Sequence, residues 1–272
     1  MKSPPARKKA TRIAAISGGQ TVRRALAVLR LVATAQEHGI RLTDIVAMSG
    51  LSRPTTHRLL KVLIDETVVE QIARTHRYRI GSELPLLGLA RGAGLPIRAI
   101  AEPYLRALAD EVGDTIFLSV RHGADSVCIA RYLGNHGIQV LSIDVGVRRP
   151  LGLSVSGMVL LAGLEWDLAR SLTRTNASRL VRLGRTPAQV RKLVRSARAE
   201  EYVHAVEGVM PGTSAIAVPL RDADGCMIAA ISMAALADRL NQQRLTEVLA
   251  KMRTCATIIS QRNTKVQRRA LV

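Results

Sequence analysis

Residues 42–66 read LTDIVAMSGLSRPTTHRLLKVLIDE, and this stretch decides the fold of the first part of the chain. Two polar residues that commonly cap helices, Thr43 and Ser52, each precede a run of apolar residues, and Gly50 lies between the two runs. The second run predicts a helix over 53–66, with a proline tolerated in its first turn. A helix, a tight glycine turn and a second helix form the helix-turn-helix motif.

The second of these helices separates into two faces when its residues are placed at about 100° intervals. The apolar face holds Leu59, Leu60, Val62 and Leu63, and the opposite face holds Arg53, His57, Arg58 and Lys61. Such a helix can pack on its domain while its donor side chains enter the major groove of DNA. Thr55 and Thr56, at the positive helix end, are suited to phosphate contacts. The alternative is a merely solvated basic face.

The flanking segments extend the motif in both directions. Apolar residues at three- and four-residue intervals predict a helix from Thr21 to near His38. Two short strands, 68–72 and 77–80, are expected after the motif, joined by a hairpin loop. Such a hairpin forms a wing, whose tip would carry Arg74, His76 and Arg77 to the flanking DNA backbone or minor groove. A wing that only completes the sheet is the alternative.

Charge and composition point to a polyanionic partner. The chain has 272 residues, 47% of them hydrophobic, which suits two folded domains, and a net charge of +19. It holds only 1 Trp, 4 Tyr and 1 Phe, too few to stack the bases of single strands, so duplex DNA fits better. Residues 1–20 contain basic side chains and no acidic ones. We expect a disordered arm that lies along phosphates, with a solubilising tail as the alternative.

Several other classes of protein are disfavoured. The N-terminal segment is too weakly apolar for a signal peptide, and no apolar stretch is long enough to span a membrane, so we expect a cytoplasmic protein. The three cysteines lack CxxC spacing, which argues against disulfides and a zinc site. No catalytic serine elbow or metal-ligand spacing is present, so we expect no catalytic residues, no metal and no cofactor.

The rest of the chain predicts an α+β domain. A helical region over 83–110 is interrupted by glycines and Pro96. Beyond it, strands are expected over 115–120, 126–132, 138–143, 215–220 and 226–233, and helices over 154–164, 186–200 and 241–261. Strands at both ends of a domain with helices between them indicate one sheet layered by helices.

Taken together, these motifs resemble the IclR-type bacterial transcriptional regulators over about residues 21–262. The resemblance rests on sequences in both halves: VRRAL (22–26), TTHRLL (55–60), YRIG (78–81), Pro150-Leu151 followed by Ser154, Gly157 and LLA (160–162), Pro211-Gly212, AIAVPL (215–220) and Asp224-Gly225. The chain departs from the family at two places. Glu66-Thr67-Val68 stands where a glycine is common, and Met158 stands where many members have lysine.

Beyond the basic arm (1–20), the resemblance implies the following organisation: a winged helix-turn-helix domain (21–82), a linker helix region (83–110) and a GAF-like effector-binding domain (111–272). It also implies DNA contacts from a dimer or dimer of dimers on a pseudo-palindromic operator, with repression the commoner outcome. The expected DNA-binding residues are Arg24, Ser52, Arg53, Thr55, Thr56, His57, Arg58, Lys61, Arg74, His76 and Arg77.

By the same resemblance, the second domain binds a small effector. Leu151, Val155 and Ser156 would offer backbone amides to an anion at a helix N-terminus, and Ala205, Ala215, Ser232 and Ala234 would complete the wall. Three alanines make this wall weakly polar, which favours an aromatic or alkyl carboxylate over glyoxylate or pyruvate. Three alternatives are core packing by these small residues, a DNA-tethered enzyme, and a non-specific nucleoid-associated protein that binds by charge alone.

Overall fold

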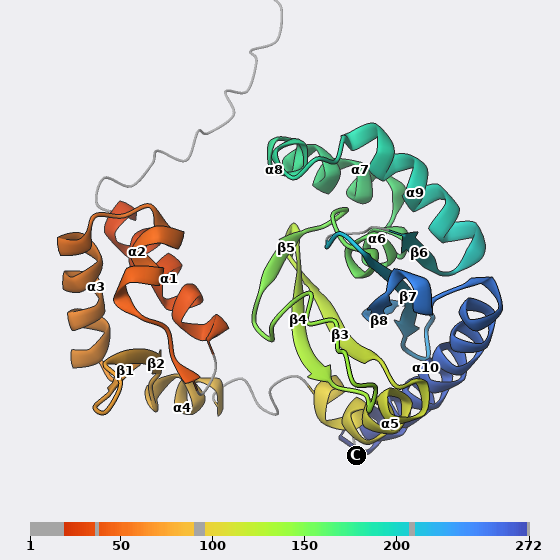
Figure 1. Ribbon diagram of the computed structural model, residues 1–272, viewed down its shortest axis with the longest axis horizontal. Coiled ribbons are helices and arrows are strands. Elements are labelled where there is room, and N and C mark those ends of the chain that lie inside the picture. The colour runs from red at the N-terminus through yellow and green to blue at the C-terminus, as the bar shows by residue number, and fades with distance from the viewer. Residues whose placement is uncertain (1–18, 36–37, 90–95, 207–209, 271–272) are drawn as a thin grey trace, which may run out of the picture. The chain divides into compact units, whose positions relative to one another are not determined.

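The computed structural model describes residues 19–35, 38–89, 96–206 and 210–270. The chain folds into two compact units whose boundary falls between Leu87 and Gly88 (Figure 1). Most of the predicted basic arm, residues 1–18, and the predicted break in the linker region, residues 90–95, lie outside the described residues. Residues 19 and 20, expected in the arm, instead open the first helix.

The first unit is a winged helix-turn-helix domain. Its elements are α1 (Gly19–Thr34), α2 (Leu42–Ser49), α3 (Arg53–Asp65), β1 (Val69–Ile72) and β2 (Arg77–Ile80), followed by α4 (Glu83–Leu89), which ends two residues past the boundary. The two strands pair antiparallel, with Val69 opposite Ile80. Gly50 ends α2 with φ +67°, a left-handed conformation that glycine adopts without strain. The predicted glycine turn between the two helices is confirmed.

Three local predictions for this unit are wrong. The residue that caps α2 is Arg41, which makes no side-chain cap, and Thr43 lies inside the helix. The first helix ends at Thr34, before His38. Val62 is 58% exposed, because it lies about 100° around α3 from the centre of the buried face. The buried face itself, with Leu59 and Leu60, packs on residues of α1 and α2 such as Val28 and Ile45.

The turn from α3 into the wing is strained at Thr67. This β-branched residue has φ +54°, in the left-handed region where a side chain is disfavoured. Gly81, after β2, passes so close that a Cβ there would lie 2.1 Å from the carbonyl oxygen of Thr67. The left-handed backbone explains physically why a glycine would suit the position that Thr67 occupies.

The second unit is an antiparallel six-stranded sheet with helices on both faces. The strand order is β5-β4-β3-β8-β7-β6. The strands are β3 (Thr115–His122), β4 (Asp125–Tyr132), β5 (Arg148–Pro150), β6 (Val203–Val206), β7 (Thr213–Arg221) and β8 (Met227–Leu236). The helices are α5 (Pro96–Val112), α6 (Val155–Ala162), α7 (Trp166–Thr175), α8 (Ala177–Arg182), α9 (Pro187–Glu200) and α10 (Gln242–Ala270), with a 3₁₀ turn, η2 (Ala237–Arg239), before α10.

The predicted α+β class is confirmed, but not every element is. The segment 138–143 is irregular and not a strand, because Gln139 turns its amide to the backbone of Gly113 and His136. The edge strands β5 and β6 and the helices α7 and α8 were not predicted. The edge strands are only three and four residues long, too short to show an alternating pattern.

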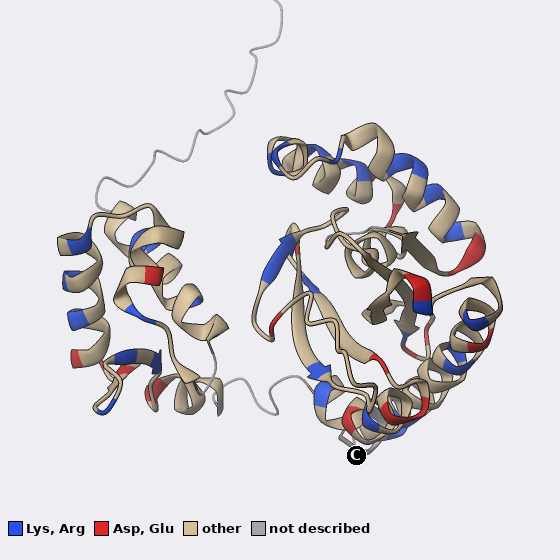
Figure 2. Cartoon of the chain, viewed as in Figure 1, with Lys and Arg blue, Asp and Glu red and all other residues tan. Residues whose placement is uncertain are grey.

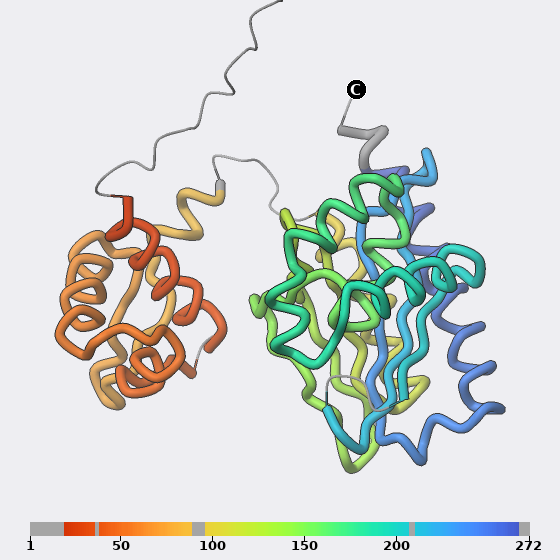
Figure 3. The backbone as a smooth tube through the Cα atoms, turned by 90° about the horizontal axis from the view of Figure 1, so that it is seen from above, coloured from red at the N-terminus to blue at the C-terminus, as the bar shows by residue number. Residues whose placement is uncertain are grey.

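Alternation along the central strands assigns each side chain to one helical layer. On β8, Ile231 and Met233 join a core with α5 and α10, while Ala230 joins a second core with α6 and α9. Figure 3, seen from the side of α7–α9, shows these helices in front of the strands and α10 beyond them. Ser232 and Ala234 therefore lie on the α6 side of the sheet.

Candidate DNA-contacting face and effector cavity

The helix α3 presents its predicted donor residues to solvent. Arg53, His57, Arg58 and Lys61 are all exposed within the described unit. The helix is positioned by Ser52, whose hydroxyl accepts a hydrogen bond from the amide of Thr55 at 3.4 Å. Arg24, on α1, is exposed as well. The arrangement leaves a basic helix face free for a groove of DNA.

One predicted phosphate contact is wrong. Thr56 is 0% exposed, and its hydroxyl donates to the carbonyl of Ser52 at 3.0 Å. The side chain therefore faces the core and stabilises the first turn of α3. Thr55 is half-buried, and its hydroxyl lies 2.9 Å from that of Ser52. Ser52, which is exposed, and Thr55, which is partly exposed, both lie at the helix N-terminus, where they were predicted.

The wing places two of its three predicted residues at the tip. Arg74 and His76 lie exposed in the turn between β1 and β2, and His76 has φ +53°. Arg77 does not lie at the tip, because it begins β2 and its guanidinium donates to the carbonyl of Gly39 at 3.2 Å. His76 lines the same surface hollow as Arg53 and His57. The wing tip and the start of α3 therefore line one surface hollow together.

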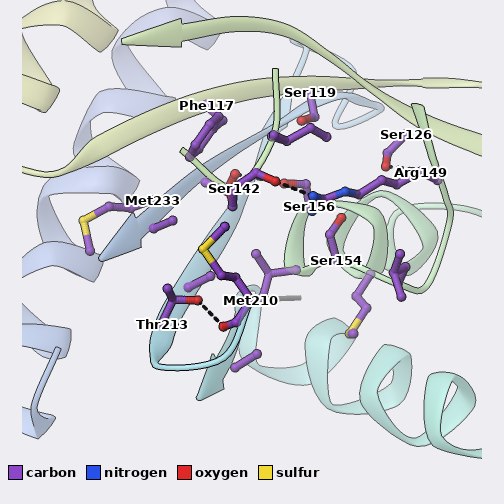
Figure 4. A pocket seen from close by; sticks show the side chains of 18 of the residues that line it. Phe117, Ser119, Ser126, Ser142, Arg149, Ser154, Ser156, Met210, Thr213 and Met233 are labelled. Atoms are coloured by element: carbon purple, nitrogen blue, oxygen red, sulfur yellow. Dashed lines mark hydrogen bonds between the residues drawn. The ribbon is translucent and has the colours of Figure 1, made fainter. Parts of the chain in front are cut away.

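The second unit contains a cavity between α6 and the sheet, with about 650 Å³ of unoccupied space including its mouth (Figure 4). Six of the seven predicted effector residues line it, namely Val155, Ser156, Ala205, Ala215, Ser232 and Ala234. The structure thus brings together residues from segments that are distant in the sequence.

Strand register explains why the floor of the cavity consists of small side chains. Ala205 of β6 pairs with Ala215 of β7, and Ala215 pairs with Ala234 of β8. These three alanines form one row across the sheet, and the neighbouring row joins Phe117 to Ser232. Methyl groups in a continuous row leave the space above them unfilled. This register is what hollows the α6 side of the sheet.

The prediction that Leu151 lines the site is wrong. Its side chain is 0% exposed in the core beneath α6, and its amide donates to the carbonyl of Ala124 at 3.0 Å. The amides of Val155 and Ser156 precede the first intrahelical hydrogen bond, which Met158 donates to Ser154. The Ser154 hydroxyl accepts from Gly157 at 3.2 Å. Two helix N-terminal amides at the cavity are thus left for a ligand.

Two arginines at the cavity were not predicted. Arg149, in the middle of β5, donates to the carbonyl oxygen of Ser142, and Arg185 lies in the loop before α9. Burial lowers the pKa of both guanidinium groups, although each stays charged at neutral pH. The lining residues include no Asp or Glu. The cavity therefore holds positive charge that the described residues do not neutralise.

Apolar surface faces these charges. Phe117, Met158 and Met210 line the cavity together with the alanine row. Methionine side chains adapt to irregular ligand shapes. Phe117 could have been found from the alternation along β3, whereas the positions of Arg149 and Arg185 depend on a short edge strand and a loop. The lining of the cavity therefore combines apolar side chains with positive charge.

The remaining chemistry of the described chain is sparse. Within residues 19–35, 38–89, 96–206 and 210–270, no group of three His, Cys, Asp or Glu side chains could hold a metal ion. None of the helices in these ranges combines the length and the apolar character that crossing a membrane requires. Cys128 and Cys255 are buried thiols and Cys226 is exposed.

Family models match both units of the chain. Residues 21–73 match the family model "IclR helix-turn-helix domain", and residues 89–261 match "Bacterial transcriptional regulator IclR C-terminal". The chain is 31% identical over 235 residues to the transcriptional regulator BhcR of Paracoccus denitrificans, covering 85% of this chain and 82% of that protein. It is 29% identical to the glycerol operon regulatory protein of Streptomyces coelicolor, covering 89% and 95%.

Solved structures show the same architecture. An IclR homolog from Microbacterium hydrocarbonoxydans, crystallised with 4-hydroxybenzoate, superposes with a TM-score of 0.69 at 23% identity, covering 90% of this chain and 99% of that one. A transcriptional regulator from Rhodococcus sp. RHA1 has a TM-score of 0.68 at 26% identity, covering 91% and 99%. With both family models matched in order, the chain belongs to the IclR family of DNA-binding transcriptional regulators, with an N-terminal helix-turn-helix and a C-terminal effector-binding domain.

Proposed function

We propose that this regulator is a repressor that binds a pseudo-palindromic operator as a homodimer or dimer of dimers, and that a small carboxylate changes its affinity for that operator. The observation that supports DNA reading most directly is the exposed donor face of α3, with Arg53, His57, Arg58 and Lys61. An exposed arginine can form a bidentate pair with guanine in the major groove. The basic arm, if it lies along phosphates, adds affinity without sequence preference.

The other predicted DNA-binding residues take supporting roles in this proposal. Arg74 and His76 at the wing tip contact the flanking backbone or minor groove. Ser52, Thr55 and Arg24 contact phosphates around the recognition helix. Thr56 and Arg77 are left out of the interface, because both side chains bond within the domain.

The effector class follows from the two kinds of surface in the cavity. Arg149, Arg185 and the amides at the start of α6 supply donors for a carboxylate. Phe117, the methionines and the alanine row supply apolar contact, which an effector with only two or three carbons would leave unused. We therefore assign the site to an aromatic or alkyl carboxylate. The 4-hydroxybenzoate in the Microbacterium hydrocarbonoxydans structure is a ligand of this kind.

An effector can shift operator affinity only through different affinities for two arrangements of the protein. The ligand in this proposal contacts α6, β8 and the loop before α9 at once, so its affinity depends on how these elements are spaced. The arrangement that binds the carboxylate best is then the one that binds the operator less well.

The test is calorimetric titration of the full chain with benzoate, 4-hydroxybenzoate and octanoate, beside glyoxylate and pyruvate. The larger acids should bind at least about ten-fold more tightly, a difference of about 1.4 kcal/mol. The acid that binds should also release the protein from DNA taken from around its own gene. Tight binding of glyoxylate or pyruvate without binding of the larger acids would overturn the effector class.

A further inference from the structure

The excess positive charge of the second unit is concentrated in one segment. Residues 93–272 contain 24 Lys and Arg and 15 Asp and Glu, and residues 168–199 contain nine of the basic side chains and no acidic one. In the rest of residues 93–272 the two signs are therefore balanced, with 15 of each. Figure 2 shows these cations along α7, α8 and α9. We propose that this helical layer is a second DNA-binding surface, which contacts the phosphate backbone.

The layer presents its cations on a continuous part of the fold. The helices α7, α8 and α9 pack against one another in pairs. Five side chains point to solvent and make no ion pair or hydrogen bond with the described residues, namely Arg170, Arg174, Arg182, Arg191 and Lys192. These side chains lie on helices whose apolar faces pack in the core beneath α6. Apolar packing therefore fixes the helices, and no ion pair from these five cations is needed to hold them.

The other cations of the segment have local roles. Arg179 pairs with Asp125 at 2.6 Å, and Arg185 lines the effector cavity. Arg195 and Arg198 lie over the ring of Trp166, at 5.4 and 5.1 Å from its centre. These contacts keep α9 and α7 together. The five free cations are left as the groups available to a partner.

Several observations favour DNA as this partner. Like charges gathered on one surface repel each other, and a polyanion removes that repulsion. Eight of the nine cations are arginine, whose fork of donors matches phosphate oxygens. The family to which the chain belongs binds duplex DNA through its first unit, so a duplex is held near the second unit at a high effective concentration.

A protein with acidic side chains is the competing occupant. Leu168, Val181 and Leu183 are 43%, 58% and 53% exposed in and beside α7 and α8, and apolar side chains next to cations also suit a protein interface. The two partners differ in what they do to the salt dependence of DNA binding. Only phosphate contacts release counterions from DNA.

The experiment measures the dissociation constant of the full chain on a random-sequence duplex of about 60 bp as a function of salt, because the slope reports phosphates neutralised. The test variant replaces the five free cations with glutamine: R170Q, R174Q, R182Q, R191Q and K192Q. The matched control removes the same charge from exposed positions of the balanced part of the unit: R98Q, R121Q, K251Q, R262Q and K265Q. Thermal unfolding confirms that both variants are folded.

The test variant should lower the magnitude of the slope of log Kd against log salt by at least about 2, since each lost phosphate contact removes about 0.9. The control should change it by less than about 1. Equal changes in both variants, or a wild-type slope in the test variant, would overturn the proposal, and the second result would favour an acidic protein partner. Sequence preference is judged separately, by the ratio of operator to random-duplex affinity, so failure here leaves the operator-binding role intact.

Discussion

The hydroxyl of Ser156 on α6 donates a hydrogen bond to the hydroxyl of Ser232 on β8, with 2.9 Å between the oxygens. Both residues line the effector cavity, so this bond joins its helical roof to its floor on the sheet. A carboxylate that enters the cavity can accept from either hydroxyl, and the distance between α6 and β8 then depends on the ligand.

The coupling between these two serines is measurable. In a double-mutant cycle of Ser156→Ala and Ser232→Ala, we expect a coupling of about 1 kcal/mol in the free energy of unfolding, the usual net value of one hydrogen bond. Denaturant titration of the four proteins measures it. Additive effects of the two substitutions would show that the bond does not join roof and floor.

Charge at the cavity should set its preference for acids. Arg149→Gln and Arg185→Gln should each weaken binding of the carboxylate found by titration by about ten- to one-hundred-fold, since hydrogen bonds to charged groups contribute about 1.5–3 kcal/mol. The matching primary amide serves as the control ligand, and its affinity should change little. If acid and amide lose affinity equally, the arginines shape the cavity without recognising charge.

The strained turn before the wing predicts a stabilising substitution. Thr67→Gly should raise the free energy of unfolding of the first unit by about 1 kcal/mol, because glycine adopts φ +54° without a side-chain clash. Thr67→Ala keeps a Cβ and should recover less. Chemical denaturation of the full chain, with hydrogen exchange of the wing amides as the probe, measures the difference in unfolding free energy between the variants. A destabilised glycine variant would show that the Thr67 side chain has a role of its own.

Two neighbouring residues of α3 should separate stability from DNA binding. Thr56→Val removes the hydrogen bond to Ser52 in the core and should cost about 1 kcal/mol of stability, with DNA affinity unchanged for the folded protein. Arg58→Ala should leave the melting temperature unchanged and weaken operator binding at least about ten-fold, the loss of one specific contact. The reverse pattern would mean that α3 does not face DNA as proposed.

The three thiols should differ in reactivity. Burial raises the pKa of Cys128 and of Cys255 to about 11, so only about one in a thousand of either is thiolate at about pH 8. Lower pH decreases that fraction further, and access is blocked as well. Iodoacetamide with mass spectrometry should label the exposed Cys226 first, and the buried pair only after denaturation. Fast labelling of Cys128 in the folded chain would contradict the packing around it.

The sequence predicted the elements that carry a strong local pattern. The apolar spacing of α3, the glycine at φ +67° after α2 and the serine cap at Ser52 depend on neighbouring residues, and all three were found. The prediction for Thr56 was wrong because its hydroxyl can either face solvent or donate a hydrogen bond within its own helix turn, and it donates to the carbonyl of Ser52. Pattern alone does not settle that competition.

Only part of the cavity could be predicted, because some of its lining residues are brought together by tertiary packing and not by a local pattern. Its alanine row comes from strands whose alternation is visible in the sequence, and the resemblance located most of its wall. Arg149 and Arg185 come from a three-residue edge strand and a loop, and only the pairing of β4 with β5 and the packing of α9 bring them to the site. The charge of the cavity is therefore a tertiary property.

The proposed regulatory role depends most on the exposed face of α3 reading a specific DNA sequence. The direct measurement is the affinity of the full chain for duplexes from around its own gene, compared with scrambled duplexes of equal length over a range of salt concentrations. We expect the wild-type chain to prefer one site by at least about 10³, and the double variant Arg53→Ala, Arg58→Ala to lose most of this preference. Equal affinity for all duplexes at every salt concentration would contradict it, because a protein that binds by charge alone behaves in that way.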